Sequence, residues 1–251
     1  MRYFIQLSYD GTNYHGWQIQ QNARSVQEEV EKALAVIARE KVEIVGAGRT
    51  DTGVHATFYI AHFNSSHAGL ADENILFKIN CLLPFDIAVQ KIFRVSDDAH
   101  ARFDAIYREY KYYLSRTKDP FSFHYTEKEN RKLNLEKMNE AAKILFKTND
   151  FTSFSKLGSD AKTNNCKVTK AFWEEKGDQF VFTIRADRFL RNMVRAIVGT
   201  LLEVGLEKMK IADFKAVIEK KNRSSAGASV AAKGLFLVDI GYPDVTPPIT
   251  D

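Results

Sequence analysis

Hydrophobic and polar positions alternate at the start of the chain. From residue 3 to residue 9 every second side chain is aromatic or aliphatic, the period of a strand with one buried face. A turn-rich stretch, residues 10–16, ends this strand. Ser25 and Glu28 have the spacing of a capping box, and the apolar residues behind them recur at helical spacing, which predicts a helix over 25–38. The pattern then predicts strands over 42–47, 57–63 and 87–95, with a helix over 72–82 before the last of these strands.

The second part of the chain repeats this order of elements. A long strand over 105–114 is followed by a helix around 135–145, a strand pair, a further helix and a closing strand; the predicted ranges are 169–175, 180–186, 190–204 and 235–242, with an additional helix over 211–220. The order βαββαβ is typical of ferredoxin-like domains. The fold class is therefore predicted to be α+β, with two ferredoxin-like or RRM-like halves, 1–103 and 104–251, and largely antiparallel sheets.

Composition and charge narrow the class of protein. The 251 residues are 45% hydrophobic and 27% charged, which is enough apolar material for a folded core. Residues 1–103 carry a net charge of −2 and residues 104–251 a net charge of +6. A polyanionic partner and an ordinary lysine-rich surface both explain this excess. Because neither a signal peptide nor a membrane span is evident, we expect a soluble cytoplasmic protein.

Residues 46–55, Gly-Ala-Gly-Arg-Thr-Asp-Thr-Gly-Val-His, have the most unusual local composition. The stretch lacks the Gly-Lys-Ser/Thr ending of a P-loop, and Asp51 stands where a dinucleotide fingerprint has its third glycine. What remains is one carboxylate, Asp51, among Arg49, Thr50 and His55, in a loop whose glycines allow another molecule to approach closely. The simpler interpretation is a hairpin loop with an Asx turn.

Two basic features lie in the second part. Arg188, Arg191 and Arg195 recur at spacings of three and four on the predicted helix, and Arg195 has apolar neighbours that favour a carboxylate or phosphate partner. The alternative for Arg188 and Arg191 is the solvated side of an amphipathic helix. Tyr110 and Tyr112 share one face of the strand over 105–114 with Arg108, as in sheets that stack RNA bases, although such a face is more often core.

Metal and nucleophile motifs have no support in the sequence. No GxSxG, HExxH or EF-hand spacing occurs, and Cys81 and Cys166 form no CxxC pair, so we expect no metal, no zinc site and no disulfide framework. The six histidines show no ligand pattern. His62 and His67 flank a loop and are expected to be exposed.

Several segments together resemble the tRNA pseudouridine synthase A family. They occur in the family's order over nearly the whole chain; the matching pieces are YDGTNYHGWQIQ (9–20), AGRTDTGVHA (47–56), HARFDA (100–105), REYKY (108–112), DFTSF (150–154) and FLRNMVRAIVG (189–199). The run Gly-Arg-Thr-Asp-x-Gly-Val-His is the most specific of these.

The resemblance implies an activity and a set of roles. It implies isomerisation of uridine to pseudouridine at positions 38–40 of the tRNA anticodon arm by a homodimer that needs no cofactor. It makes Asp51 the catalytic aspartate, Arg49 the residue that displaces the base and Tyr110 the ring that stacks on it. It pairs Arg195 with Asp51, which requires one catalytic cleft between the halves. A carboxylate suits this chemistry because it can attack or deprotonate, and a base in a stem must flip out to be reached.

One segment departs from the family pattern. Where relatives usually carry prolines before the last strand, this chain has Gly-Ala-Ser-Val-Ala over 227–231, so we expect a freer loop there. Two other classes of function also remain. A non-catalytic RNA-binding protein or RNA chaperone would need the basic and aromatic residues but not Asp51, and a metal-free hydrolase would use Asp51 on another sugar derivative.

Overall fold

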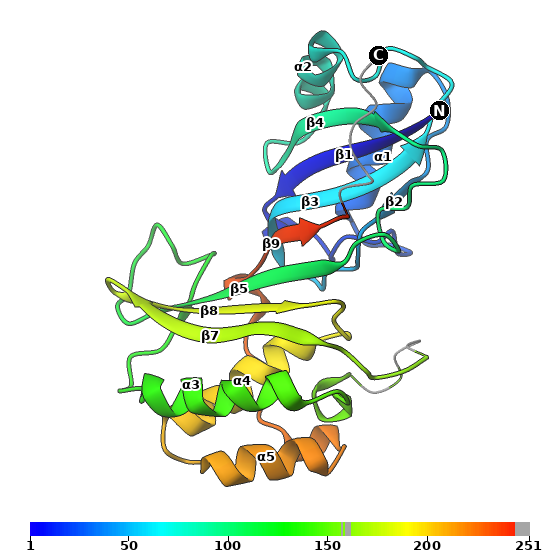
Figure 1. Cartoon of the computed structure of the whole chain (residues 1–251). Helices are drawn as coiled ribbons and strands as arrows, with labels where there is room; N and C mark the ends of the chain where they lie inside the picture. Colours follow the sequence, from blue (N-terminus) through cyan, green and yellow to red (C-terminus); the bar gives the residue numbers. More distant parts are fainter. Residues whose placement is uncertain (157, 159–161, 244–251) are drawn as a thin grey trace. The chain divides into compact units, whose positions relative to one another are not determined.

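The chain divides into two compact units in the computed structural model, which describes residues 1–156, 158 and 162–243 (Figure 1). The first unit contains residues 1–107 and the end of the chain from Leu237, and the second contains residues 108–236. Each unit has its own helices and its own set of paired strands.

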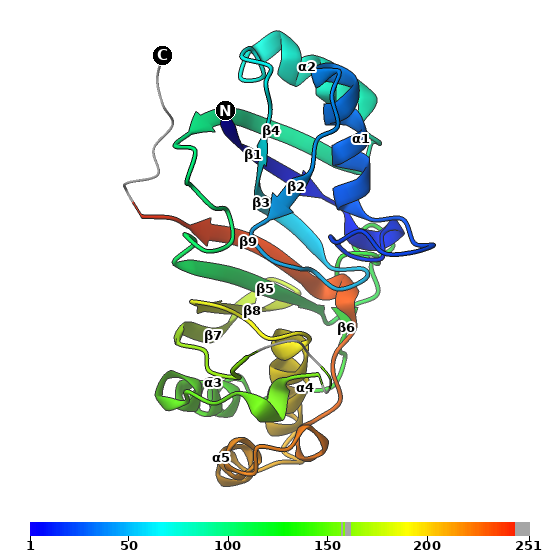
Figure 2. The ribbon, with the colours of Figure 1, turned by 90° about the vertical axis from the view of Figure 1, so that its right-hand side faces the viewer.

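The first unit has the predicted order of elements. These are β1 (Arg2–Tyr9), α1 (Val26–Ala38), β2 (Ile44–Gly46), β3 (His55–Asn64), α2 (Glu73–Leu82) and β4 (Ile87–Val95). The strand order is β4-β1-β3 with β2 paired to β3, and each of these pairs is antiparallel, as in a ferredoxin-like sheet. Helices α1 and α2 lie together on one side of this sheet (Figure 2). The part of β9 (Leu235–Gly241) from Leu237 onward continues the sheet beside β3.

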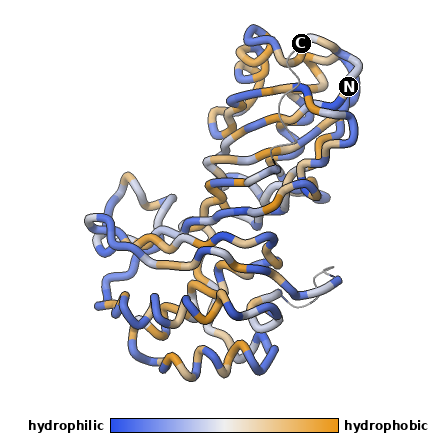
Figure 3. The backbone as a smooth tube through the Cα atoms, in the orientation of Figure 1, coloured by the Kyte–Doolittle hydropathy of each residue, from blue (hydrophilic) through white to orange (hydrophobic). Residues whose placement is uncertain are grey.

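Local signals in the sequence set these boundaries. The hydroxyl of Ser25 accepts the N–H of Glu28 at 3.3 Å, so the predicted cap begins α1. Asp72 caps α2 by accepting the N–H of Asn74 at 2.7 Å. Hydrophobic and hydrophilic positions alternate along the strands (Figure 3). Strand β1 differs from the prediction in one respect. Ile5 lies on the face predicted to be buried, but Phe4 on the opposite face is buried as well. The second face of the sheet is therefore also covered at this position.

The second unit repeats the order with one added helix. Its elements are β5 (Tyr107–Ser115), β6 (Glu127–Lys128), α3 (Leu135–Lys143), β7 (Val168–Lys176), β8 (Gln179–Ala186), α4 (Met193–Gly205) and α5 (Ile211–Glu219). Strand β8 pairs with β5 and with β7, antiparallel in both cases, and the short β6 runs parallel to β5. The three helices lie on one side of these strands (Figure 1). The predicted α+β class with largely antiparallel strands is confirmed.

Helix α4 is the central helix of the second unit. It is buried along most of its length, and Ile197 and Leu201 are fully enclosed in the core with Phe182 of β8. Such a helix is stabilised by tertiary burial and not by its own propensity. Within the described residues, no helix is long and apolar enough to cross a bilayer.

His62 is buried, contrary to the expectation of exposure, and His67 is half-buried. His62 lies on β3 opposite Phe4 of β1, and its Nδ1 accepts the N–H of Ala101 at 3.1 Å. Burial lowers the pKa of His62 to about 4, with a further contribution from His100 and Arg2. The imidazole is therefore a neutral core group.

Stability should depend on pH through His62. Its folded pKa of about 4 lies below the ordinary 6.5, so the unfolded chain binds the proton first and stability falls as pH drops from about 6.5 towards 4. The loss attributable to this group reaches about 3 kcal/mol. His62→Asn should flatten the dependence of the free energy of unfolding on pH in this window, as measured by urea titration. His67→Asn, which removes a half-buried histidine of the same unit, is the control. Equal slopes for wild type and His62→Asn would contradict the assignment.

Candidate active site

Asp51 lies in the loop that joins β2 to β3. The carbonyl of Asp51 accepts the N–H of Val54 at 3.1 Å, which closes a tight turn, and Gly53 in this turn has a φ of +75°. Asp51 is half-buried, whereas Arg49 is exposed. The hairpin interpretation is thus correct for the backbone. Arg49 lies in the same loop, two residues before Asp51 and this turn.

Two buried tyrosines support this loop from the sheet. The hydroxyl of Tyr9 on β1 lies 2.9 Å from that of Thr50, and the hydroxyl of Tyr59 on β3 donates to the carbonyl of Gly48. Trp17 stacks on Tyr59 with ring centroids 4.1 Å apart, and all three rings are buried. Because the two tyrosine hydroxyls are the polar ends of a packed aromatic cluster, Gly48 and Thr50, the residues on either side of Arg49, are held in place.

The turn-rich segment over 10–17 packs directly on the Asp51 loop. The N–H of Gly53 donates to the carbonyl of Tyr14 at 3.3 Å, and that of Trp17 donates to Thr50 at 3.4 Å. A Cβ on Gly16, whose φ is +92°, would lie 2.3 Å from the carbonyl oxygen of Thr50. A Cβ on Gly11 would lie 2.1 Å from that of Val54. Only glycine permits this approach of two backbones.

His55 has a structural role in this contact. It is 1% exposed, and its Nδ1 accepts the N–H of Gly11 at 3.0 Å. An Asp10 carboxylate oxygen also lies 3.0 Å from Nδ1. Asp10 accepts the backbone N–H and the hydroxyl of Thr12 as well. His55 therefore joins the two loops.

In the second unit, the predicted arginine stripe is wrong. Helix α4 begins at Met193, so Arg188 and Arg191 precede it and only Arg195 is helical. Asn192 adopts a φ of +66°, and this left-handed residue interrupts the helical pattern that the spacing implied. Arg191 is exposed in the segment before the helix, and its carbonyl accepts the N–H of Lys156.

Arg195 is hydrogen-bonded to the proline-free segment over residues 227–231. Its Nε donates to the carbonyl of Val230 at 2.7 Å, and the N–H of Val230 donates to the carbonyl of Arg195 at 3.2 Å. Ser229 accepts hydrogen bonds from Asn192 and Arg223, at 2.6 and 2.8 Å. These hydrogen bonds, and not the rings of proline residues, hold residues 227–231 against α4. The expectation of a freer loop finds no support in these contacts.

The tyrosines of β5 separate into a core residue and a surface residue. Tyr112 is fully buried, and its hydroxyl donates to the carbonyl of Ala231 at 3.0 Å. Tyr110 is half-buried, and its ring meets that of Phe189 edge to face at 5.1 Å. Glu109, which precedes Tyr110, is buried beside Arg185 and Lys170, at 2.6 and 3.1 Å. Of the two rings, Tyr110 is the one that keeps accessible surface.

The described part of the chain contains no group of three or more His, Cys, Asp or Glu side chains that could hold a metal ion. The two cysteines are free; Cys81 is exposed and Cys166 is buried. Burial raises the pKa of Cys166 to about 12, so it stays a thiol at neutral pH.

Comparison with known proteins identifies the family. The model of a family described as tRNA pseudouridine synthase matches residues 6–104 and 141–243, which include the Asp51 loop and α4. The chain belongs to this tRNA pseudouridine synthase family. The proteins named tRNA pseudouridine synthase A from Parabacteroides distasonis and Bacteroides fragilis are 56% and 55% identical to it, over 100% and 96% of this chain and 99% and 96% of their own. That of Bacillus subtilis is 38% identical over 96% of this chain and 99% of its own.

The structure of this family member places the predicted site residues in two groups. Asp51 and Arg49 share one loop of the first unit. Tyr110 and Arg195 belong to β5 and α4 of the second unit. The sequence interpretation missed the support from Tyr9, Gly11 and Gly16, although the glycines and aromatic residues of 9–17 were the available signal.

The close contact between the two loops predicts unequal effects of two glycine substitutions. Gly16→Ala should destabilise the protein by at least about 1–3 kcal/mol, because alanine is strained at this φ and its Cβ would meet Thr50. Gly48→Ala in the same loop is the control: no atom lies within 4 Å of the position that its methyl group would take, and the change should stay within about 0.5 kcal/mol. Urea unfolding measures both. Equal stability of the two variants would show that the loops are not in contact.

Proposed function

We propose that this chain is a tRNA pseudouridine synthase that isomerises uridine to pseudouridine at positions 38–40 of the anticodon stem-loop, with Asp51 as its catalytic residue. The observation that carries the proposal is the match to the tRNA pseudouridine synthase family across both units, together with full-length relatives named tRNA pseudouridine synthase A. The loop that Tyr9 and Tyr59 support by hydrogen bonds carries the Asp51 carboxylate that the proposed reaction uses.

Asp51 suits a reaction in which one bond to the uracil ring is exchanged for another. The C1′–N1 glycosidic bond breaks, the ring turns, and C1′ joins C5; C5 loses its proton and N1 takes one up. A carboxylate can attack C1′ or the base, or remove a proton from the sugar. Since the product is an isomer of the substrate, no oxidant, reductant or hydrolytic water is consumed, and we expect neither cofactor nor metal to be required. Support comes from the half-buried carboxylate on a turn tied to the sheet.

Tyr110, Arg49 and Arg195 complete the proposed set. Tyr110 receives the flipped base, since its ring keeps accessible surface and is oriented by Phe189. Arg49 displaces the base, which its exposed position two residues before Asp51 supports. Arg195 is the proposed partner of the Asp51 carboxylate. Its firm attachment to Val230 supports a fixed guanidinium. Arg188 and Arg191 contribute weaker phosphate contacts.

We further propose that the enzyme acts as a homodimer in the cytoplasm, on tRNA. The bacterial relatives carry the name of a tRNA-modifying enzyme, which supports this location. The excess of positive charge over residues 104–251 supports a polyanionic substrate. A non-catalytic RNA-binding protein would share that charge, but RNA binding alone would not require the hydrogen-bonded loop that carries Asp51.

Asp51→Asn should abolish the reaction and leave the fold intact. Single-turnover tritium release from tRNA transcripts labelled at C5 of uridine should fall by a factor on the order of 10³ or more, because the amide can neither attack nor accept a proton. Filter binding should give a tRNA dissociation constant within about threefold of wild type.

Asp98→Asn, a change at an exposed carboxylate of the same unit, is the matched control and should release tritium at the wild-type rate. Near-normal turnover by Asp51→Asn would disprove the catalytic assignment. Absence of tritium release from the wild type, with intact tRNA binding, would favour the RNA-binding alternative.

Arg191 and Arg195 should respond differently to replacement by alanine. Arg191→Ala should weaken tRNA binding and reduce the slope of log K against log salt by about 0.7–0.9, the value for one phosphate contact. Arg195→Ala should lower turnover per bound tRNA, because Asp51 loses its proposed partner. Thermal melting of both variants checks the fold. Equal loss of binding with normal turnover would make both residues phosphate ligands and remove the proposed pair.

A further inference from the structure

The segment His-Ala-Arg-Phe-Asp over 100–104 is a turn closed by its own hydrogen bonds. The N–H of His100 donates to the carboxylate of Asp104 at 2.7 Å, and the N–H of Asp104 donates back to the carbonyl of His100 at 3.0 Å. Nδ1 of His100 accepts the N–H groups of Arg102 and Phe103, at 3.1 and 3.3 Å. The side chains of His100 and Asp104 thus bond to the backbone of the turn, which has a defined shape before anything binds to it.

The same turn is fastened to the sheet of the first unit. Ala101 is buried; its N–H donates to Nδ1 of His62 at 3.1 Å, and its carbonyl accepts the hydroxyl of Tyr242 at 2.6 Å. The ring of His100 lies against that of His62, with centroids 4.5 Å apart. This attachment covers the second face of β1 and β3, and it leaves Arg102 and Phe103 on the outer side of the turn.

Phe103 is 75% exposed although the turn beneath it is well ordered by contacts. Its ring stacks obliquely on His100 at 4.2 Å, and the guanidinium of Arg102 lies 5.7 Å from its centroid. A single exposed apolar residue is common and by itself needs no explanation. Here the ring is oriented by one neighbour and flanked by a cation, which is the arrangement of platforms that stack bases and hold the adjacent phosphate.

Arg102 also lines a hollow beside the proposed catalytic loop. This hollow, of about 190 Å³, is bordered by Gly48 and Arg49 of that loop, by Gly46 at the end of β2 and by the buried Trp17. Arg49 and Arg102 are the charged members of its described lining, and the other members are neutral. Two cations from separate segments of the first unit therefore line the same hollow, and their guanidinium groups are suited to contact a phosphate.

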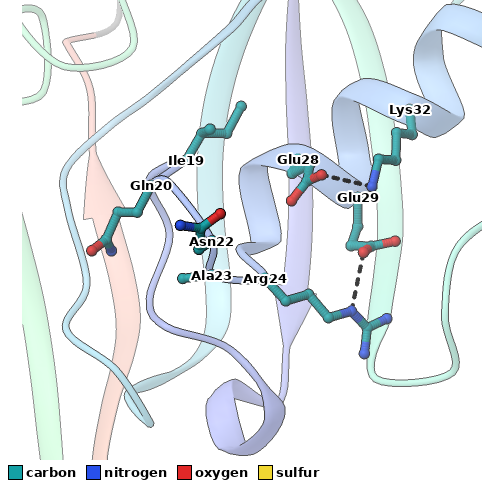
Figure 4. A pocket seen from close by; sticks show the side chains of 8 residues that line it. All are labelled: Ile19, Gln20, Asn22, Ala23, Arg24, Glu28, Glu29 and Lys32. Atoms are coloured by element: carbon teal, nitrogen blue, oxygen red, sulfur yellow. Dashed lines mark hydrogen bonds and ion pairs between the residues drawn. The ribbon is translucent and has the colours of Figure 1, made fainter.

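A second hollow of the same unit gives a useful contrast. It is larger, about 370 Å³, and its basic residues are already paired with carboxylates of α1 (Figure 4). Arg24 lies 3.0 Å from Glu29, and Lys32 lies 2.7 Å from Glu28. Its described lining therefore contains carboxylates as well as cations, whereas the described lining of the smaller hollow contains no acidic residue.

We infer that Phe103 and Arg102 form a nucleotide-binding subsite: an unpaired base of the substrate RNA next to the target uridine stacks on Phe103, and its phosphate lies between Arg102 and Arg49. The inference rests on the proposed function for the identity of the RNA. An RNA is favoured over a protein surface because both charged residues of the hollow's described lining are cations, which suits a phosphate group. The subsite adds binding energy outside the reacting base.

Phe103 is tested by equilibrium binding of a fluorescein-labelled anticodon stem-loop RNA, followed by anisotropy on the Asp51→Asn background so that the RNA is not converted. Phe103→Ala should raise the dissociation constant about 5- to 150-fold, the range for one lost stack. Phe103→Trp should stay within about threefold, because another flat ring restores the stack. Phe85→Ala is the matched control: Phe85 belongs to the same unit, is 96% exposed and should not alter the affinity.

Arg102 is tested by the salt dependence of the same binding. Arg102→Gln should reduce the slope of log K against log salt by about 0.7–0.9, and Arg102→Lys should restore it, because the charge and not the shape sets this slope. Lys41→Gln, at an exposed lysine of the same unit, should change neither slope nor affinity.

The outcomes separate the subsite from the proposed function. If wild type makes pseudouridine while Phe103→Ala binds RNA as Phe85→Ala does, the subsite is wrong and the function stands. Equal loss for Phe103→Ala and Phe103→Trp also overturns stacking. If Phe103→Ala changes the sedimentation coefficient but not the RNA affinity, Phe103 belongs to a protein interface and the inference fails. If wild type neither binds nor modifies the RNA, both proposals fall together.

Discussion

The contact between the segment 10–17 and the Asp51 loop is the constraint on which the site of the first unit depends. Two backbones approach so closely at Gly11 and Gly16 that a methyl group at either position would overlap a carbonyl oxygen. The approach lets Tyr14 and Thr50 exchange loop hydrogen bonds with residues of the opposite segment. These contacts restrict the conformations of the Asp51 loop and so help to position Arg49 and Asp51.

Each unit uses its hydrophobic core to position polar groups. In the first unit, Tyr9 and Tyr59 bury their rings and present their hydroxyls to the loop. In the second, the buried α4 carries Arg195, and the main chain of Val230 holds it from the other side. Burial supplies the stability, and the hydrogen bonds at the edge of the core select the orientation. Residues 227–231 show that hydrogen bonds to Ser229 can hold a segment that contains no proline.

The motif over 100–104 illustrates how a short sequence can be structural and functional at once. His100 and Asp104 are occupied within the turn, and Ala101 is bonded to His62 and Tyr242. Arg102 and Phe103 are the residues that this bonding leaves directed outward. A histidine expected at the surface is therefore a neutral core group, and the burial that lowers its pKa is a consequence of supporting this turn.

Local chemistry in the sequence determined the elements: strand alternation predicted β1 and β4, capping residues predicted the starts of α1 and α2, and the glycine-rich run predicted a loop around Asp51. These follow from interactions within a few residues. The tertiary structure decided what depends on distant neighbours: that Phe4, His62 and Tyr112 are buried, and that Arg188 and Arg191 precede α4 because Asn192 turns left-handed. It also decided that Gly16 serves a loop more than thirty residues away, since periodicity along a chain contains no information about which segments meet.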